Sequence, residues 1–275
     1  MKTTLIIAAQ EIRDGFRNRW IIGLTLVLAV FALSLTLLGS APGGTVGASP
    51  LLVTVVSLSS LTVLLLPLIG LMLSYDAIVG EAERGTLLLL LSYPVQRWNV
   101  MAGKFLGHVV ILSFATVIGY GIAGGVAAYS GDGVEPEAWM AFLSMVTSSV
   151  ILGSSFLAIG YLISTCVRER ATAGGIAIGV WLLFVLVYDM ALLGLLVSQG
   201  EDLGSGVFQA LLLANPTDVY RLFNLGGFDN IATLSGTIGM VAEIKFPTWA
   251  LGGVQLIWVV VPLGIAAVLF KKKEI

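Results

Sequence analysis

Charged residues, cysteine and histidine are all scarce in this chain. Only 11% of its 275 residues are charged, and it holds one cysteine, Cys166, and one histidine, His108. A single cysteine excludes an intrachain disulfide and any cysteine-based metal cluster. Soluble domains carry about 25% charged residues, whereas this chain is 57% hydrophobic. The composition therefore predicts an all-α polytopic membrane protein.

The sequence also lacks the motifs of nucleotide and metal chemistry. The segment Gly80 to Thr86 has two glycines at the separation found in a phosphate-binding loop, but Thr86 stands where that loop needs a lysine. His108 and Cys166 are soft ligands that could meet at one membrane face, as a copper(I) site requires. Two isolated residues without a motif spacing more often serve packing, so we expect no metal site.

Seven segments account for most of the chain. Leu5, Ala9, Ile12 and Phe16 share one helical face, which predicts an amphipathic surface helix over residues 1–19. A membrane-spanning helix needs about 20 mostly apolar residues. Six runs meet this requirement, at residues 20–39, 51–75, 105–129, 139–166, 173–197 and 249–270.

The basic residues predict the orientation of these six spans. Twelve of the fourteen Lys and Arg residues fall on one side of the predicted membrane, and the other side holds only Arg221 and Lys245. Short cytoplasmic loops accumulate Lys and Arg. We therefore expect a multi-pass membrane protein with six spans and both termini in the cytoplasm.

The segment Gly80 to Lys104, GEAERGTLLLLLSYPVQRWNVMAGK, is too charged to cross a bilayer. It belongs to a predicted cytoplasmic loop over residues 76–104. We expect one short surface helix from Glu81 to Leu91, with its acidic residues in the first turn, where the helix dipole favours them. Pro94 disfavours helix at the residue before it and so ends this helix. Such an element is suited to binding a cytoplasmic partner.

The predicted outer loop at residues 198–248 is much longer than the other two outer loops. It is too apolar for a disordered segment, so we expect short helices that rest on or dip into the outer leaflet. The loop is either a partner-binding surface or a structural cover for the spans. Asp189, the one acid well inside a span, is predicted to make a polar contact near this outer face.

The surface helix, the six spans and the first inner loop together resemble the ABC-2-type permeases. The loop reads E-x-E-R-G-T-L…L-L-S-x-P-V-x-R…G-K, which places the pattern on residues Glu81 to Lys104. In that family this loop is the main coupling helix, seated in a groove of a separate ATPase, and a second, smaller contact matches Val167 to Thr172. The resemblance implies coupling roles for Glu81, Glu83, Arg84, Gly85, Thr86, Leu87, Ser92, Pro94, Val95, Arg97, Lys104, Arg168, Glu169 and Arg170.

Within this family, the chain is most similar to permeases of the copper-processing transporters that mature nitrous oxide reductase. Its length and the run NPTDVYRL, Asn215 to Leu222, carry this closer resemblance. It implies a homodimer, a cytoplasmic ABC ATPase subunit that holds ATP and Mg, and a periplasmic β-helical protein that handles copper. The chain itself would be non-catalytic, without a cofactor and without a nucleic-acid partner. The candidate periplasmic partner surface is Asn215, Pro216, Asp218, Tyr220 and Arg221.

Two alternatives remain open from the sequence. The first is an ABC-2 exporter of another substrate. The second is a secondary transporter driven by an ion gradient, which predicts ionisable groups at the bilayer midplane and an internal repeat. The spans offer Asp189 alone and no convincing repeat, so we favour an ATP-driven permease that transports a substrate or transmits a conformational signal.

Overall fold

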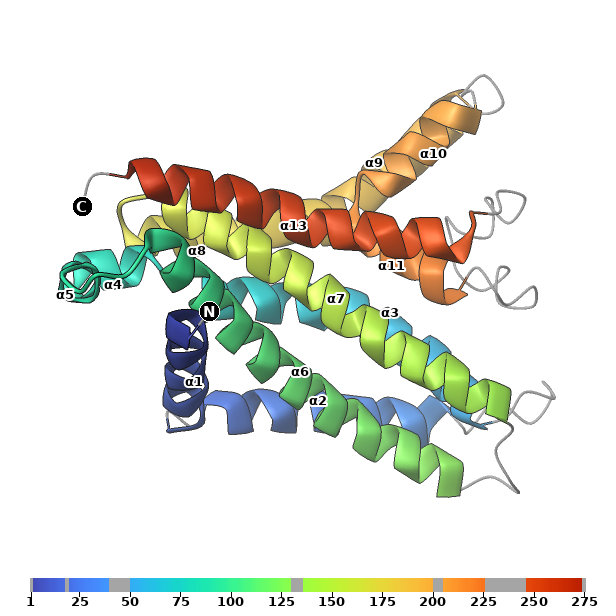
Figure 1. The fold of residues 1–275 in the computed structure, drawn as a ribbon. Helices are drawn as coiled ribbons and strands as arrows, with labels where there is room; N and C mark the ends of the chain where they lie inside the picture. The colour runs from blue at the N-terminus through green and yellow to red at the C-terminus, as the bar shows by residue number, and fades with distance from the viewer. Residues whose placement is uncertain are drawn as a thin grey trace.

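The computed structural model describes residues 2–17, 20–39, 50–129, 136–199, 205–225 and 246–273. Every regular element within these ranges is a helix. The long helices run alongside one another in one bundle, with α4 and α5 projecting at one end and α10 and α11 near the other (Figure 1).

The helices of the first half begin with the amphipathic α1. They are α1 (Lys2–Arg17), α2 (Trp20–Gly39), α3 (Pro50–Ser74), α4 (Val79–Glu83), α5 (Thr86–Leu91) and α6 (Arg97–Tyr129). The second half contains α7 (Pro136–Cys166), α8 (Arg170–Leu182), a π-helical turn (Leu183–Val187), α9 (Tyr188–Gln199), α10 (Ser205–Leu213), α11 (Pro216–Leu225) and α13 (Thr248–Lys272).

Helix α7 forms the centre of the bundle. It packs against α3, α13 and α6, and it is the most buried of the candidate membrane spans. Small side chains such as Ser149 and Ser155 line much of its length and are almost fully buried. Their hydroxyl groups donate to carbonyls of the preceding turn of α7, and the Ser149 hydroxyl also lies 2.9 Å from the Tyr220 hydroxyl of α11. A helix of this composition can be approached closely on several sides.

Five helical segments are long and apolar enough to cross a membrane, and a sixth candidate arises when α1 and α2 are counted together as one bent pair. The structure therefore agrees with a polytopic all-α protein of five to six spans. Helix α2 has the predicted bounds, and α3 and α13 match their predicted spans to within two residues. The fifth predicted span corresponds to α8, the π-helical turn and α9.

Two predicted boundaries in the first inner loop are wrong. The third span was placed at residues 105–129, but α6 already begins at Arg97. This start is possible because the charges of Arg97 and Lys104 both find partners inside the protein. The single surface helix Glu81 to Leu91 is instead two helices, α4 and α5, separated at Gly85.

Helix α1 lies across the bundle at about 70° to α2 and packs mainly on α6 (Figure 1). Two glycines of α6 make this close approach possible. A Cβ atom at Gly103 would lie 2.8 Å from the Cβ of Ile7, and one at Gly107 would lie 2.6 Å from the Cβ of Glu11. The predicted amphipathic helix is therefore confirmed as a helix, but its buried residues are Ile7 and Ala8, whereas Leu5, Ala9 and Phe16 of the predicted apolar face are exposed.

The predicted outer loop contains two helices in its described part, α10 and α11. Phe208, Leu212 and Val219 from these helices pack against Leu192 of α9 and Leu251 of α13. The expectation of short helices is confirmed for residues 205–225. Residues 226–245 of the same predicted loop lie outside the described residues.

Candidate functional site

The two short helices α4 and α5 form a hairpin-like projection at one end of the bundle (Figure 1). Gly85 separates them with φ of +72°, a left-handed conformation that glycine adopts without steric penalty. In α5, Leu87 is fully buried, whereas Leu88 and Leu89 are 54% and 68% exposed. Tyr93, just beyond α5, is 66% exposed. The projection thus has one face packed on the bundle and one apolar face left uncovered in the single chain.

A buried ammonium group ties this projection to two other helices. Lys104 of α6 is 4% exposed, and its Nζ donates a hydrogen bond to Glu81 Oε1 of α4 at 2.7 Å. The same Nζ also donates to Glu11 Oε1 of α1. Opposite charges at this depth must be paired, so the three residues fix α1, α4 and α6 relative to one another. Glu81 and Lys104 thus face the interior, and their place in the site is to position α4.

Ser164 of α7 holds the beginning of α4. Its Oγ accepts hydrogen bonds from the backbone N–H groups of Ile78 and Val79, both at 3.0 Å. The first N–H groups of a helix have no partner within the helix, and here a side chain from another helix supplies it. Helix α4 is therefore attached to the central helix of the bundle at its first residue.

The second predicted contact, the turn between α7 and α8, lies beside α4. The backbone N–H of Arg170 donates to Glu83 Oε1 at 2.7 Å, and the Arg170 guanidinium pairs with Asp76 at 3.0 Å. The structure thus brings Glu83 and Arg170 together, although 87 residues separate them. Arg168 and Glu169 are exposed in the same turn. The two inner contacts predicted from the sequence form one continuous surface.

Two basic residues donate hydrogen bonds to the carbonyls at the C-terminal ends of neighbouring helices at this end of the bundle. Arg97 donates from Nη1 to the carbonyls of Phe270 at 2.8 Å and Lys273 at 2.6 Å, at the end of α13. Lys273 donates from Nζ to the carbonyls of Thr165 at 2.9 Å and Val167 at 2.8 Å, at the end of α7. Cations at a helix C-terminus satisfy its free carbonyls and oppose its dipole. Arg97 therefore joins α6 to α13 rather than facing outward.

The remaining predicted coupling residues occupy the outer side of the projection. Thr86 is exposed and donates to the Glu81 carbonyl at 3.3 Å, and Ser92 is exposed and donates to the Leu89 carbonyl at 2.8 Å. Arg84 and Pro94 are exposed, whereas Val95 is half-buried against the bundle core. Arg84, Thr86, Ser92 and Pro94 are therefore accessible to a partner.

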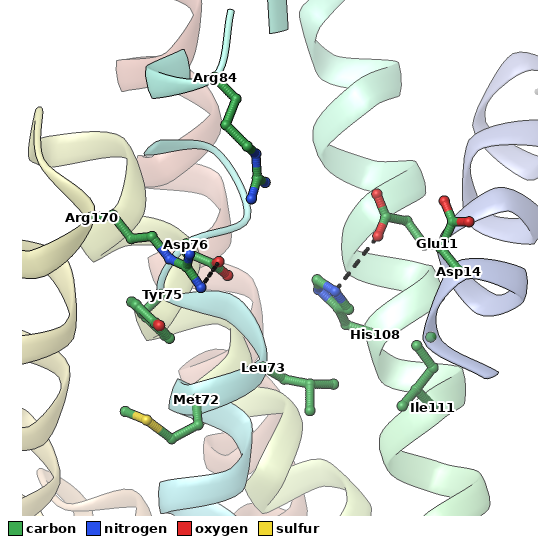
Figure 2. A pocket seen from close by; sticks show the side chains of 11 residues that line it. Glu11, Asp14, Met72, Leu73, Tyr75, Asp76, Arg84, His108, Ile111 and Arg170 are labelled. Atoms are coloured by element: carbon green, nitrogen blue, oxygen red, sulfur yellow. Dashed lines mark ion pairs between the residues drawn. The ribbon is translucent and has the colours of Figure 1, made fainter. Parts of the chain in front are cut away.

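An open polar cavity of about 560 Å³ lies behind the projection. Figure 2 shows Arg84 and Arg170 on one side of it and Glu11, Asp14 and His108 on the other. His108 Nδ1 lies 2.8 Å from the hydroxyl of Tyr161 on α7. The cavity thus contains side chains of both signs of charge at the junction of α1, α3, α6 and α8.

His108 and Cys166 line different cavities, and Cys166 is exposed. Among the described residues, no group of three or more His, Cys, Asp or Glu side chains is placed to hold a metal ion. The structure thus does not bring together the histidine and cysteine that the sequence offered as soft ligands.

At the opposite end, the predicted partner surface is folded inward. Asn215, Pro216 and Tyr220 are buried, Asp218 is 4% exposed, and the Arg221 side chain is 21% exposed. The expectation that these five residues form an exposed surface is therefore wrong for the single chain. Asn215, Asp218 and Arg221 bond to the fifth span or to one another, and the Tyr220 hydroxyl lies 2.9 Å from that of Ser149 on α7. An outer partner of this segment would therefore contact neighbouring residues.

The contacts of this inward segment centre on the π-helical turn. Such a turn frees a backbone carbonyl from its usual helical partner, and the Asn215 amide donates to the carbonyl of Phe184 at 3.0 Å. Arg221 pairs with Asp189 at 2.6 Å and with Asp218 at 3.0 Å. The prediction that Asp189 makes a polar contact near this face is confirmed.

Several positioning residues were not found from the sequence. Glu11, Asp76, Ser164 and Lys273 carry no motif, and their partners are distant in the chain. Gly103 and Gly107 did offer a signal, because a G-x-x-x-G spacing favours close helix approach. Two other pairs at this spacing, Gly121/Gly125 and Gly175/Gly179, have nothing within 4 Å of their added Cβ positions.

Comparison with known proteins decides the family. Residues 5–275 match the family described as ABC-2 family transporter protein. The chain belongs to the ABC-2 transporter family. It is 43% identical over 268 residues to a protein of Stutzerimonas stutzeri named probable ABC transporter permease protein NosY, with 97% of each chain covered. A Pseudomonas aeruginosa protein of the same name is 42% identical over 276 residues, with 100% of each chain covered.

These full-length similarities identify the chain as the permease subunit of an ABC transporter. ABC permeases work with an ATPase subunit. The end of this permease that carries α4 and α5 is the candidate binding site for that subunit. The exposed apolar face of α5 and the adjacent α7–α8 turn are the features of this end that a soluble subunit could bind.

Proposed function

We propose that this permease couples ATP hydrolysis by a separate cytoplasmic ABC ATPase to transport or conformational signalling across the bacterial inner membrane. The ATPase docks on the projection α4–α5 and on the turn before α8. The observation that carries this proposal is the projection itself, which exposes Leu88, Leu89 and Tyr93 on one face while its other face is anchored in the bundle. Exposed apolar patches of this kind are typical of protein interfaces.

The anchoring contacts supply a route from the ATPase to the membrane. Glu81 bonds to Lys104 on α6, and the start of α4 bonds to Ser164 on α7. A displacement of α4 by the ATPase would therefore act on α6 and α7 directly. Arg97 extends this route to α13 through the carbonyls of Phe270 and Lys273.

The predicted coupling residues then divide into two groups by exposure. Arg84, Thr86, Ser92, Pro94, Arg168 and Glu169 are exposed and would contact the ATPase. Glu81, Leu87, Val95, Arg97 and Lys104 face the bundle and would hold the projection in place, with Gly85 allowing the turn between its helices. Glu83 and Arg170 join the two inner contacts to each other.

The wider role we propose is maturation of the copper sites of periplasmic nitrous oxide reductase. The resemblance of the Asn215 to Leu222 run and the full-length similarity to two NosY permeases support it. A periplasmic copper-handling protein would dock at the α10–α11 end and receive the signal. ATP and Mg would stay with the ATPase, and copper with the periplasmic partner.

A second copy of the permease would complete the assembly, with both termini in the cytoplasm. In the single chain, only 11% of the most apolar window of the fifth span, Arg170–Ser198, is buried. Gly175 and Gly179 on it have open space around them, which would let another helix approach closely. These features support a homodimer that uses this face.

The ion-gradient alternative has less support. It requires an ionisable group free to exchange its ion, and Asp189 is engaged with Arg221 at 2.6 Å.

Co-purification in mild detergent tests the proposal. The unmodified permease should retain the ATPase, whereas Glu83→Lys and Arg84→Glu should lose it or uncouple ATP hydrolysis from reductase maturation, because charge reversal repels the docked surface. Arg13→Glu, an exposed change on α1 away from the projection, is the control. Normal reductase maturation with either variant would show that the coupling role is wrong.

A further inference from the structure

A second open cavity, of about 880 Å³, lies between α4, the end of α7 and the end of α13. Its lining includes three cationic side chains, Arg168, Lys272 and Lys273, and one carboxylate, Glu83. Cys166 and the apolar Leu269 of α13 also line this cavity. We refer to this cavity as the basic crevice.

The positive charge of the basic crevice is not neutralised within the described part of the chain. Arg168 and Lys272 are exposed, and neither forms an ion pair with a described residue. Glu83, which accepts the backbone N–H of Arg170, is the one carboxylate in the lining, so the cationic side chains outnumber it three to one. Burial lowers the pKa of the Lys273 ammonium, and Arg168 beside it adds to the lowering. The crevice is thus suited to an anion.

An exposed apolar row on α13 leads directly to the basic crevice. Ile257, Val261, Ile265 and Leu269 recur every four residues and are 57%, 50%, 47% and 38% exposed. Residues at this spacing share one face of a helix. Leu269 belongs both to this row and to the crevice lining. The row lies along a candidate membrane span, so hydrocarbon is available to cover it.

We propose that the basic crevice binds the phosphate headgroup of an anionic membrane lipid. Arg168 and Lys272 contact the phosphate oxygens, and an acyl chain lies along the row from Ile257 to Leu269. Basic pockets at the ends of membrane helices favour such headgroups. Lys273 is a positioning residue, because its Nζ is engaged by the carbonyls of Thr165 and Val167.

The apolar row is what favours a lipid over the other anions that could enter. A free phosphate ion would use the cations and leave the row unused. An acidic segment of the ATPase could reach the crevice from the cytoplasm, but it would not extend along a membrane span. The lipid site shares Arg168 with the proposed ATPase contact and is lined partly by α4, whereas Lys272 and the apolar row of α13 belong to the lipid site alone. A change in the row therefore tests lipid binding separately from ATPase docking.

The test uses the full-length permease in a neutral detergent and a fluorescent phosphatidylglycerol, followed by anisotropy. Unlabelled phosphatidylglycerol should displace the probe, whereas phosphatidylcholine and inorganic phosphate at equal concentration should not. The double variant Arg168→Gln/Lys272→Gln should bind on the order of 20-fold more weakly, given the contribution of each basic residue at an anionic surface. A single variant, Ile265→Gln, should weaken the lipid without changing any charge.

Lys2→Gln/Arg13→Gln is the matched control, because it removes two exposed cations from α1. It should bind the lipid like the unmodified protein, and circular dichroism should show the same helix content for all variants. Equal weakening in the control, or equal displacement by phosphatidylcholine, would overturn the proposal. Displacement by inorganic phosphate as effective as by lipid would assign the site to a free anion. If the Arg168→Gln/Lys272→Gln variant kept its lipid affinity but no longer retained the ATPase, the basic crevice would be a binding site for the protein partner.

Discussion

The Lys104 ammonium lies 2.7 Å from the Glu81 carboxylate and also binds Glu11, so one buried cation joins α6, α4 and α1. The segment that looks most like a free surface loop in the sequence is in fact anchored at its charged first turn. The apolar side chains Leu88 and Leu89 are left as its outward face.

Replacing the shared cation should loosen the projection. Lys104→Met leaves the carboxylates of Glu11 and Glu81 without their partner, and breaking a buried ion pair costs about 3 kcal/mol. We expect a clear fall in the thermal unfolding temperature of the detergent-solubilised protein, together with loss of coupled ATP hydrolysis. Lys2→Met, an exposed change on α1, should leave both unchanged. A Lys104→Met protein as stable as the unmodified one would show that the triad does not hold α4.

The exposed leucines of α5 should matter for binding and not for folding. Leu88→Glu/Leu89→Glu adds charge to side chains that are more than half exposed, so the unfolding temperature should change little. The ATPase should no longer co-purify. Leu87→Glu makes the informative comparison, because Leu87 is fully buried and its replacement should destabilise the protein. If the ATPase still binds the double variant, the docking face lies elsewhere.

Close packing of α1 on α6 should depend on Gly107. A Cβ there would lie 2.6 Å from the Cβ of Glu11, so Gly107→Leu must displace α1 and should cost roughly 2 kcal/mol. Gly121→Leu on the same helix meets nothing within 4 Å and should be tolerated. Thermal unfolding of the two variants checks this difference, and equal stability would refute the packing account.

The α11 end should respond to pH through Asp218. Burial, and secondarily the charge of Asp189, raise the pKa of the Asp218 carboxyl to about 7, whereas an unfolded aspartate titrates near 3.9. The folded state therefore binds the proton more strongly than the unfolded state does. The resulting contribution to the free energy of unfolding is fully present below about pH 4 and is lost as the pH rises through about 7.

Asp218→Asn should remove that dependence. Relative to this variant, the unmodified protein should lose up to about 1 kcal/mol of unfolding free energy per pH unit across the window. Unfolding curves measured at several pH values provide the comparison, with the exposed Glu137→Gln as control. Parallel curves for the unmodified protein and Asp218→Asn would contradict a buried, proton-binding Asp218.

The membrane helices could be predicted from the sequence because a bilayer imposes length and polarity on each span. For the same reason the start of α6 was misplaced. Arg97 and Lys104 looked too polar for a continuous helix, but their partners come from α13, α4 and α1. The Phe270 carbonyl is 173 residues from Arg97 in the sequence, and Glu81 is 23 residues from Lys104. No local sequence pattern indicates partners at these separations.

The sequence predicted the candidate site as one segment and did not separate the roles within it. The motif from Glu81 to Lys104 lies at one end of the bundle, and it mixes residues that face outward, such as Arg84, with residues that face inward, such as Lys104. At the other end, Asn215 and Tyr220 were expected on a partner surface because the run Asn215 to Leu222 carries the closer family resemblance. The free Phe184 carbonyl of the π-helical turn is what draws Asn215 inward, and that turn has no sequence signal.

The most direct test of the central claim is photo-crosslinking from the outward face of α5. A photo-reactive amino acid at Leu89 should capture the ATPase subunit in membranes that contain both proteins, because this side chain is 68% exposed on the projection. The same group at Leu143, 60% exposed near the start of α7, should capture no ATPase. Capture from Leu89 alone would place the ATPase on α4–α5. Failure at Leu89 in a complex that still hydrolyses ATP would contradict the account.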